Sequence, residues 1–230
     1  MLMSYTLRKK EMPKNKYSIK CPYEMKPQGI VVHNTDNNAP ASAEVNYMHS
    51  NNNQVSFHVC IDEKEVIECS PFNRCAWHCG NSKGNRTQIG IEIARNKHKD
   101  EKLFLQAEKN AAEYIASLLK KYGWGIDKVT QHANWAPKNC PSTTRKLGWQ
   151  RFLNMIKKEL KTTAKFKPYT IIVSSFDGEL NIREKPDANS KKVGVLKNGK
   201  TKYTIVEEKN GFGKLKSGAG YICLKYCKKV

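Results

Sequence analysis

The sequence predicts a mixed α/β domain, with a central sheet and flanking helices, followed by a small all-β barrel. Three observations support this prediction. Up to residue 160, apolar runs with a period of two alternate with longer amphipathic segments. The next residues lose the helical period, and the chain then changes to short β runs separated by glycines. We therefore expect one domain over residues 1–160, a linker over 161–167 and a second domain over 168–230.

Two strands are expected in the first third of the chain. The apolar run Gly29–Thr35 predicts a buried strand that delivers His33 to the edge of the sheet. The run Val55–Ile61 alternates apolar and polar side chains, which predicts a half-buried strand. Val55 begins the apolar face of this strand, and His58 lies on its polar face.

A third strand and two helices complete the elements expected in the first domain. Three isoleucines alternate over Ile89–Ile93, which places Glu92 on the face opposite to them. Apolar residues recur at helical spacing over Phe104–Tyr122, and Gly123 follows as a stop signal. A second amphipathic helix is expected over Trp149–Leu160. Strands interleaved with such helices form a mixed α/β layer, although the pattern leaves parallel and antiparallel pairing open.

The second domain is expected to contain six short strands. Closing such strands into a small barrel removes their exposed edges. The expected strands are Tyr169–Val173, Leu180–Arg183, Val193–Leu196, Tyr203–Val206, Gly213–Leu215 and Gly220–Leu224.

His33, His132 and Cys140 are the candidate ligands of a catalytic zinc ion. His132 and Cys140 lie eight residues apart in a stretch too rich in proline and asparagine for one helix, so a loop can bring both to one metal. Two neutral imidazoles and one thiolate supply three protein ligands, the number that a catalytic zinc takes when its fourth position is kept for water. Taken singly, each residue is more often structural, the cysteine as a small buried hydrophobe.

Five segments resemble one family when they are taken together. They are Ile30–Thr35, Ser56–Val59, Ala76–Gly80, Asn85–Ile93 and Gln131–Pro141. In order and spacing, they resemble the zinc-dependent N-acetylmuramoyl-L-alanine amidases of phage endolysins, which are related to animal peptidoglycan-recognition proteins. The resemblance covers about residues 20 to 160, and its motifs are specific as a set and weak individually.

The resemblance implies roles for two further side chains. Lys138 matches a family lysine that supports the oxyanion; the alternative is a solvated loop lysine. Some phage amidases use a tyrosine where this chain has Phe57, so proton transfer must come from elsewhere. Glu92 is the candidate general base. Its alternatives are to orient a ligand histidine or to pair with Arg86.

Three residues are candidates for binding the substrate. Trp77 is expected to stack on a sugar face, and His78 to contact the glycan or the stem peptide. The alternatives are a core position for Trp77 and a surface position for His78. His58 is expected either to face the substrate or to lie behind the residues that do.

The second domain also carries a resemblance. The segments Gly178–Pro186, Val193–Gly199 and Gly220–Leu224 resemble the bacterial SH3-like domain that binds cell walls. A generic β appendage is the alternative, because the alternation of Leu180 and Ile182 would look the same in any sheet.

The formal net charge of +20, from 41 basic and 21 acidic residues, predicts a polyanionic partner. Nucleic acid is the usual first candidate, but here the lysines are spread along the chain instead of being gathered in one arm or recognition helix. Anionic wall polymers such as teichoic acids fit the charge equally well, and charge alone does not choose between the two.

The expected place of synthesis is the cytoplasm. No apolar segment approaches the roughly 18 residues that span a membrane, and the amino terminus lacks the apolar region of a signal peptide. Release to the wall would then follow a holin or cell lysis. The eight cysteines are expected to stay reduced. Cys60, Cys69, Cys75 and Cys79 are expected to pack in the interior, because their spacings fit no common metal-ligand pattern.

The resemblance implies a peptidoglycan hydrolase, an endolysin or autolysin, that cuts the amide bond between N-acetylmuramic acid and the L-alanine of the stem peptide. One alternative is a peptidoglycan-recognition protein without catalysis, although such chains usually lose a ligand. A nucleic-acid-binding protein would explain the charge but not the metal ligands. A cytosolic muropeptide-recycling amidase would not need a wall-binding domain.

Overall fold

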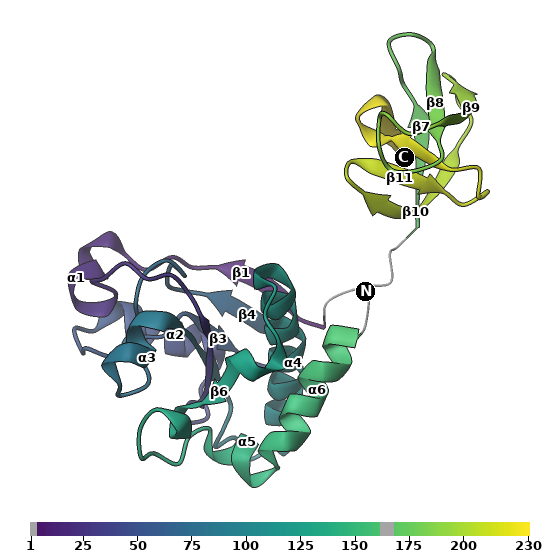
Figure 1. Cartoon of the computed structure of the whole chain (residues 1–230). Coiled ribbons are helices and arrows are strands. Elements are labelled where there is room, and N and C mark those ends of the chain that lie inside the picture. Colours follow the sequence, from purple (N-terminus) through teal and green to yellow (C-terminus); the bar gives the residue numbers. More distant parts are fainter. Residues whose placement is uncertain (1–3, 162–167) are drawn as a thin grey trace. The chain divides into compact units, whose positions relative to one another are not determined.

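The computed structural model describes residues 4–161 and 168–230, which belong to two compact units (Figure 1). The first unit is mixed α/β and the second is all-β but for one short 3-10 helix, which confirms the predicted fold class. Of the expected linker over 161–167, all but Lys161 lies outside the described residues. No helix in the described ranges has the length and hydropathy that crossing a bilayer requires.

A six-stranded mixed sheet forms the centre of the first unit, in the order β1-β4-β3-β5-β2-β6. Strands β3, β5, β2 and β6 are parallel to one another, β4 is antiparallel to β3, and β1 is parallel to β4. The carboxyl ends of β5, β2 and β6 therefore meet at one edge of the sheet. The strands are β1 (Thr6–Lys9), β2 (Gly29–Asn34), β3 (Val59–Ile61), β4 (Glu65–Glu68), β5 (Gln88–Ile93) and β6 (Val129–Gln131).

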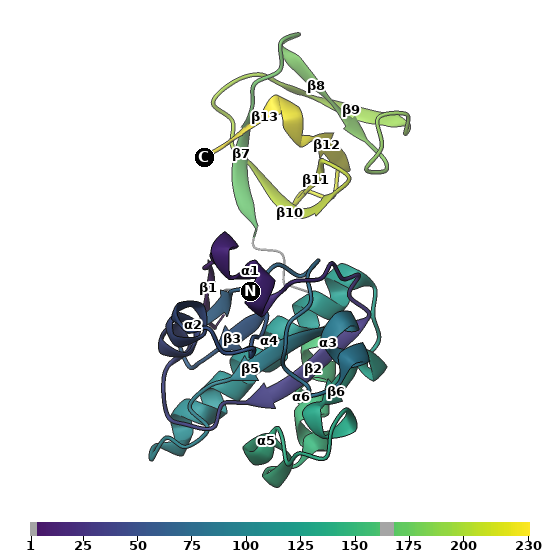
Figure 2. The same cartoon turned by 90° about the vertical axis from the view of Figure 1, so that its left-hand side faces the viewer.

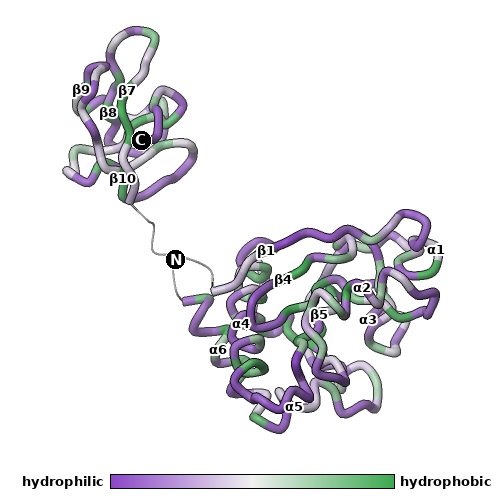
Figure 3. The backbone as a smooth tube through the Cα atoms, turned by 180° about the vertical axis from the view of Figure 1, so that it is seen from behind, coloured by the Kyte–Doolittle hydropathy of each residue, from purple (hydrophilic) through white to green (hydrophobic). Residues whose placement is uncertain are grey.

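Helices cover both faces of this sheet. The helices α4 and α6 pack with the three β5 isoleucines in the main core, and α2 packs in a second core on the other face (Figure 2). Along α4 and α6, hydrophobic and hydrophilic residues alternate as in amphipathic helices (Figure 3). The helices are α1 (Tyr17–Lys20), α2 (Ala41–Ser50), α3 (Ser82–Thr87), α4 (Glu101–Tyr122), α5 (Ser142–Lys146) and α6 (Trp149–Lys161), with 3-10 turns at Lys14–Lys16, Ile126–Lys128 and His132–Asn134.

The two long helices confirm their predictions. Helix α4 ends at Gly123, whose φ of 67° is the left-handed conformation that glycine adopts without strain. At its other end, the side chain of Asp100 accepts a hydrogen bond from the backbone N–H of Lys102 and so caps the helix. Helix α6 begins at Trp149, as expected.

The strand expected over Val55–Ile61 is wrong in its first half. Only Val59–Ile61 forms a strand, and Val55 is 61% exposed, whereas His58 is fully buried. The alternation of apolar and polar residues misleads because β3 lies inside the sheet, between β4 and β5, and the two hydrophobic cores cover both of its faces. The preceding residues are drawn away from the sheet, since the backbone N–H of Ser56 donates to the carbonyl of Trp77.

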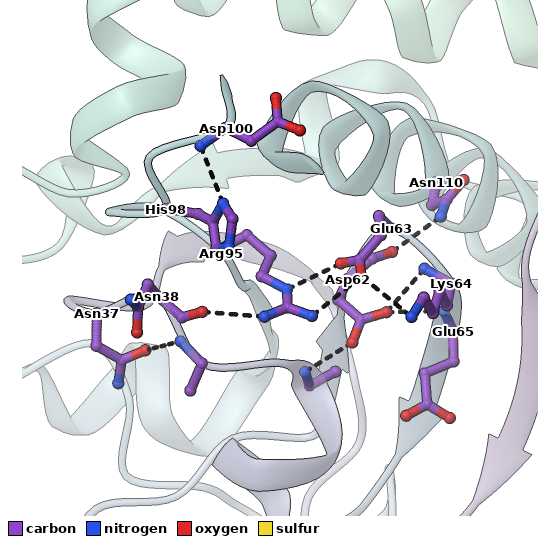
Figure 4. Close-up of polar contacts among 12 residues, drawn as sticks. Asn37, Asn38, Asp62, Glu63, Lys64, Glu65, Arg95, His98, Asp100 and Asn110 are labelled. Atoms are coloured by element: carbon purple, nitrogen blue, oxygen red, sulfur yellow. Dashed lines mark hydrogen bonds and ion pairs between the residues drawn. The ribbon is translucent and has the colours of Figure 1, made fainter. Parts of the chain in front are cut away.

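One ion pair and several hydrogen bonds hold together three connections that leave the sheet (Figure 4). Arg95 follows β5 and has a φ of 67°, a strained conformation for a residue other than glycine. Its guanidinium donates to both carboxylate oxygens of Glu63, at 2.9 and 3.0 Å, and to the carbonyl of Asn38 at 3.1 Å. Nearby, the carboxylate of Asp62 accepts from the first N–H of α2, at Ala41. The connection from β2 to α2 is thus tied to those beside β3 and β5.

The second unit is an antiparallel seven-stranded sheet around its own core, in the order β13-β7-β10-β11-β12-β8-β9. All six expected strands are present, and Cys227–Lys229 adds a seventh that the sequence pattern did not indicate. The strands are β7 (Tyr169–Val173), β8 (Glu179–Arg183), β9 (Lys192–Lys197), β10 (Tyr203–Lys209), β11 (Phe212–Leu215), β12 (Tyr221–Cys223) and β13 (Cys227–Lys229), with a 3-10 turn at Leu224–Tyr226.

Candidate metal centre and active site

The three expected metal ligands meet at the carboxyl edge of the first sheet. His33 lies at the end of β2, His132 directly follows β6, and Cys140 lies in the loop before α5. The two Nδ1 atoms of His33 and His132 are 3.0 Å apart, and the Sγ of Cys140 is 3.7 Å from the Nδ1 of His33. All three residues are buried, and their ligand atoms lie within 4.8 Å of one another.

The chemistry of these donors fits a zinc ion. Burial and the nearby charge of Lys138 lower the pKa values of His33 and His132, so both imidazoles are neutral and offer lone pairs. Burial raises the pKa of Cys140 to about 11, and the thiolate therefore needs a cation to offset its charge. Two nitrogens and one sulfur are a donor set that zinc accepts in catalytic sites. In the described part of the chain, no other cluster of histidine, cysteine and carboxylate side chains is so arranged.

Hydrogen bonds fix the loop that carries His132 and Cys140. The backbone N–H of Ala133 donates to the carbonyl of Cys140 at 3.0 Å, which closes the loop between the two ligands. The side-chain oxygen of Asn34, next to His33, accepts from the backbone N–H groups of Thr143 and Thr144 at 3.0 and 3.1 Å. The end of β2 therefore holds the segment that follows Cys140.

The two remaining histidines of the site are buried behind the ligands. His78 is 8% exposed, and its Nδ1 lies 3.0 Å from the Nε2 of His33. His58 is fully buried; its Nδ1 accepts from the N–H of Gly90, and its Nε2 contacts the carbonyl of Arg74, both at 2.9 Å. With both ring nitrogens used by the backbone, His58 has no group left for a substrate. The surface position considered for His78 is also excluded by its burial.

Glu92 and Lys138 line one cleft beside the ligands. The cleft has a volume of about 280 Å³, and Asn34 and Phe57 also line it. In the β-ladder, Glu92 pairs with His33, and its buried Oε2 has no hydrogen-bond partner among the described residues. Burial raises the pKa of Glu92 to about 8, with a further contribution from the charge of Glu44. Lys138 is exposed, and its charge acts in the opposite direction on Glu92.

The neighbours of Trp77 and Arg86 bear on two expectations from the sequence. Trp77 is partly buried, and its indole N–H donates to the carbonyl of Ile19 at 2.8 Å. The guanidinium of Arg86 lies 3.8 Å from the centre of the Tyr23 ring. The considered ion pair between Arg86 and Glu92 is therefore wrong.

The sequence pattern missed Lys20, which supports a wall of the cleft. Its side chain is fully buried, and its ammonium donates to the side chain of Asn51 at 2.8 Å, the carbonyl of Asn53 at 2.6 Å and the carbonyl of Val55 at 3.1 Å. All three acceptors belong to residues that line the cleft. Nothing in the sequence distinguishes Lys20 from the exposed lysines around it.

The remaining cysteines are free and mostly buried, as expected for packing residues. Cys60 and Cys69 belong to the core beneath α2, and Cys75 and Cys79 are fully buried.

Comparisons with known proteins agree with the geometry. The profile of a family described as N-acetylmuramoyl-L-alanine amidase matches residues 23–143, and that of the bacterial SH3 domain matches residues 178–223.

Two curated relatives and one solved structure are similar to this chain. The N-acetylmuramoyl-L-alanine amidase CwlA of Bacillus subtilis is 42% identical over 163 residues, which cover 69% of this chain and 60% of the relative. The amidase XlyB of the same species is 39% identical over 186 residues, which cover 79% of this chain and 58% of the relative. The structure of PlyL aligns with a TM-score of 0.63 and 43% identity over 66% of this chain and 96% of PlyL. The chain thus spans about three fifths of the length of the curated relatives.

Proposed function

The chain belongs to the N-acetylmuramoyl-L-alanine amidase family, and from that premise we propose that it is a zinc-dependent peptidoglycan hydrolase of the endolysin or autolysin type. Its substrate is the amide bond between the lactyl group of N-acetylmuramic acid and the L-alanine of the stem peptide. The observation that carries the proposal is the convergence of His33, His132 and Cys140 within 4.8 Å, beside a cleft that contains an unpartnered carboxylate.

His33, His132 and Cys140 would hold the zinc ion. When bound, zinc supplies Lewis acidity, which polarises a carbonyl and lowers the pKa of water. The chain's own contribution is to keep both imidazoles neutral by burial and to hold the loop on either side of the ligands in place. This arrangement leaves the cleft side of the centre for the substrate.

Glu92 is the proposed general base. Its carboxylate lines the cleft, and its Oε2 has no partner among the described residues, so that oxygen is available to accept a proton from water. A pKa of about 8 lies close to neutral pH, where a group both accepts and returns protons effectively. The same carboxyl then delivers its proton to the departing amine. Phe57 lines the same cleft but has no hydroxyl, which leaves this task to Glu92.

Lys138 is proposed to stabilise the oxyanion that develops on the scissile carbonyl. It is exposed at the cleft, two residues before the ligand Cys140. The thiolate donates electron density and would make the metal a weaker Lewis acid than three histidines would. A positive charge at Lys138 offsets this effect. Trp77, which is only partly buried, is proposed to contact the glycan.

Residues 168–230 are proposed to bind the cell wall. The match to the bacterial SH3 domain over residues 178–223 supports this role. The net charge of +20 also favours attraction to anionic wall polymers. Tethering the hydrolase to an insoluble polymer raises its effective concentration at the substrate. We propose the bacterial wall as the place of action.

Mass spectrometry of digested walls tests the proposal. The full chain is incubated with purified peptidoglycan, with the His33→Ala variant as control. We expect free stem peptides with an amino-terminal alanine, and glycan strands whose lactyl groups are uncoupled. Cleavage only within the glycan or within the peptide would contradict the proposed bond. A recognition protein without catalysis would sediment with the wall and release no fragment.

A further inference from the structure

His78 is a buried side chain to which the proposed mechanism gives no task. It belongs to the connection between β4 and α3, outside the sheet, yet it reaches the metal centre. Its ring meets that of His33 edge to face, with ring centres 5.1 Å apart. Its two nitrogens make one contact each, to His33 at 3.0 Å and to the backbone carbonyl of Gln88 at 3.2 Å.

The carbonyl of Gln88 sets the direction of these hydrogen bonds. A carbonyl oxygen only accepts, so the Nε2 of His78 must carry the proton. His78 is buried, and among the described residues its two ring nitrogens contact only His33 and the Gln88 carbonyl, with no carboxylate to stabilise a charged ring. In the neutral imidazole the other nitrogen then has the lone pair. The Nδ1 of His78 therefore accepts, and the Nε2 of His33 must be the donor. One proton on His33 is thereby placed, and its Nδ1 is left with a lone pair.

The Nδ1 of His33 is the atom that faces the other ligands. It lies 3.0 Å from the Nδ1 of His132 and 3.7 Å from the Sγ of Cys140. We propose that His78 is a positioning residue for the metal centre: by a hydrogen-bond relay from the carbonyl of Gln88, it fixes the His33 tautomer whose Nδ1 is free to bind the metal. This inference rests on the proposed function only in taking the metal to be zinc.

The backbone of β5 is shaped to hold the ring of His78. A Cβ added to Gly90 would lie 2.6 Å from the Cγ of His78 and within 2.9 Å of two further ring atoms. Any side chain at position 90 would push the ring away, so glycine is required there for a close approach. His58 supports this arrangement, because its Nδ1 accepts from the N–H of Gly90 and its ring lies 5.9 Å from that of His78.

Ligand histidines in proteins generally donate their second N–H to an acceptor, which orients the ring and raises its basicity. Here the acceptor is another imidazole, which is itself held by a backbone carbonyl. Substituting such a partner typically costs about 10- to 100-fold in metal affinity.

The test measures zinc affinity by chelator competition in three full-length variants. His78→Phe keeps a ring of similar size but removes both nitrogens, and Gly90→Ala keeps His78 but displaces it. His49→Phe is the matched control, since His49 is also buried and contacts the carbonyl of Cys69 at 3.0 Å, without touching a ligand. We expect a zinc Kd about 10- to 100-fold weaker for the first two variants and an unchanged Kd for the third.

A spectroscopic measurement on the unaltered protein gives a second readout that does not depend on any variant folding. Two-bond ¹H–¹⁵N spectra of the full chain after zinc removal report which nitrogen of His33 carries the proton. The proposal requires the proton on Nε2 without zinc, and a change in this population in His78→Phe. A proton on Nδ1 in the unaltered protein, or a folded His78→Phe that binds zinc as tightly as His49→Phe, would overturn it. Neither measurement uses a substrate, so absence of amidase activity would reject the proposed function and leave this test intact.

Discussion

The two units of this chain bury very different side chains. Among the described residues, the interior of the second unit consists of aliphatic and aromatic side chains, with Ser175 as its one buried polar residue. The first unit buries five histidines, together with Lys20 and Glu108. Burying polar groups is costly unless they are paired, and such groups with shifted pKa values gather where chemistry is done. The contrast fits the proposed roles, in which the second unit binds the wall and the first carries out the chemistry.

Removing a proposed metal ligand should have the largest effect, because it should abolish the proposed chemistry of the first unit and leave the second unit unchanged. We expect His33→Ala, His132→Ala or Cys140→Ala to lose zinc and activity together, because two ligands hold the ion too weakly. Metal analysis by mass spectrometry and turnover of a soluble muropeptide check this. The second unit should keep its fold in all three variants. Full wall lysis by metal-free His33→Ala would dismiss the zinc mechanism.

Glu92→Gln keeps the size of the side chain but removes its basicity. We expect turnover to fall by about 10²- to 10⁴-fold, with zinc content and folding unchanged. Glu184→Gln, the same change at an exposed position of the second unit, serves as the control. Near-normal turnover of zinc-loaded Glu92→Gln would shift the proton transfer to Lys138 or to another group of the cleft.

Ending the chain at Lys161 isolates the first unit. Turnover of soluble muropeptides should be retained, because all ligands and cleft residues precede that position. Binding to whole walls in a sedimentation assay should weaken by about 10²-fold or more, since tethering is lost. Added salt should reduce the binding that remains, because it screens the basic surface. If residues 168–230 alone bind no purified wall, their proposed role is wrong.

The smallest effect concerns stability and pH. The pKa of Glu92 is raised from 4.5 to about 8, so between these values the folded protein binds a proton that the unfolded chain does not. This difference makes stability fall as pH rises through that window. Glu92→Gln lacks this titration. In zinc-free protein, the Tm of the variant relative to wild type should therefore rise from pH 4.5 to pH 8, and a constant difference would contradict the raised pKa.

Sequence patterns predicted the long elements better than the short ones. Phe104–Tyr122 and Trp149–Leu160 have enough helical turns for the period to be unambiguous, and both helices are present. The run Val55–Ile61 is too short, and its alternation is typical of a half-buried strand, whereas β3 is covered on both faces. An alternation of apolar and polar residues indicates that one face of a strand is buried. It does not show whether a second layer of the protein covers the other face.

The proposed metal ligands could be picked out of the sequence for a reason that does not apply to the residues around them. His33, His132 and Cys140 have side chains whose chemistry limits their roles, and their motifs occur in a recognisable order. His78 and His58 are the same type of residue, but their roles depend on Gly90 and on backbone carbonyls from distant parts of the chain. Lys20 depends on a loop more than thirty residues away. Such partners are set by tertiary structure, which residue type and spacing do not specify.

Lys20 gives the cleft a built-in cation. Many loops that present several oxygens to one point are held by a dissolved metal ion, which exchanges with the medium. Here the ammonium is covalently part of the chain, so these contacts to the loop over Asn51–Val55 need no bound ion. An anionic wall concentrates counter-ions around every protein that enters it. The side of the cleft that Lys20 supports therefore takes these three contacts from the chain itself and not from an ion of that surrounding pool.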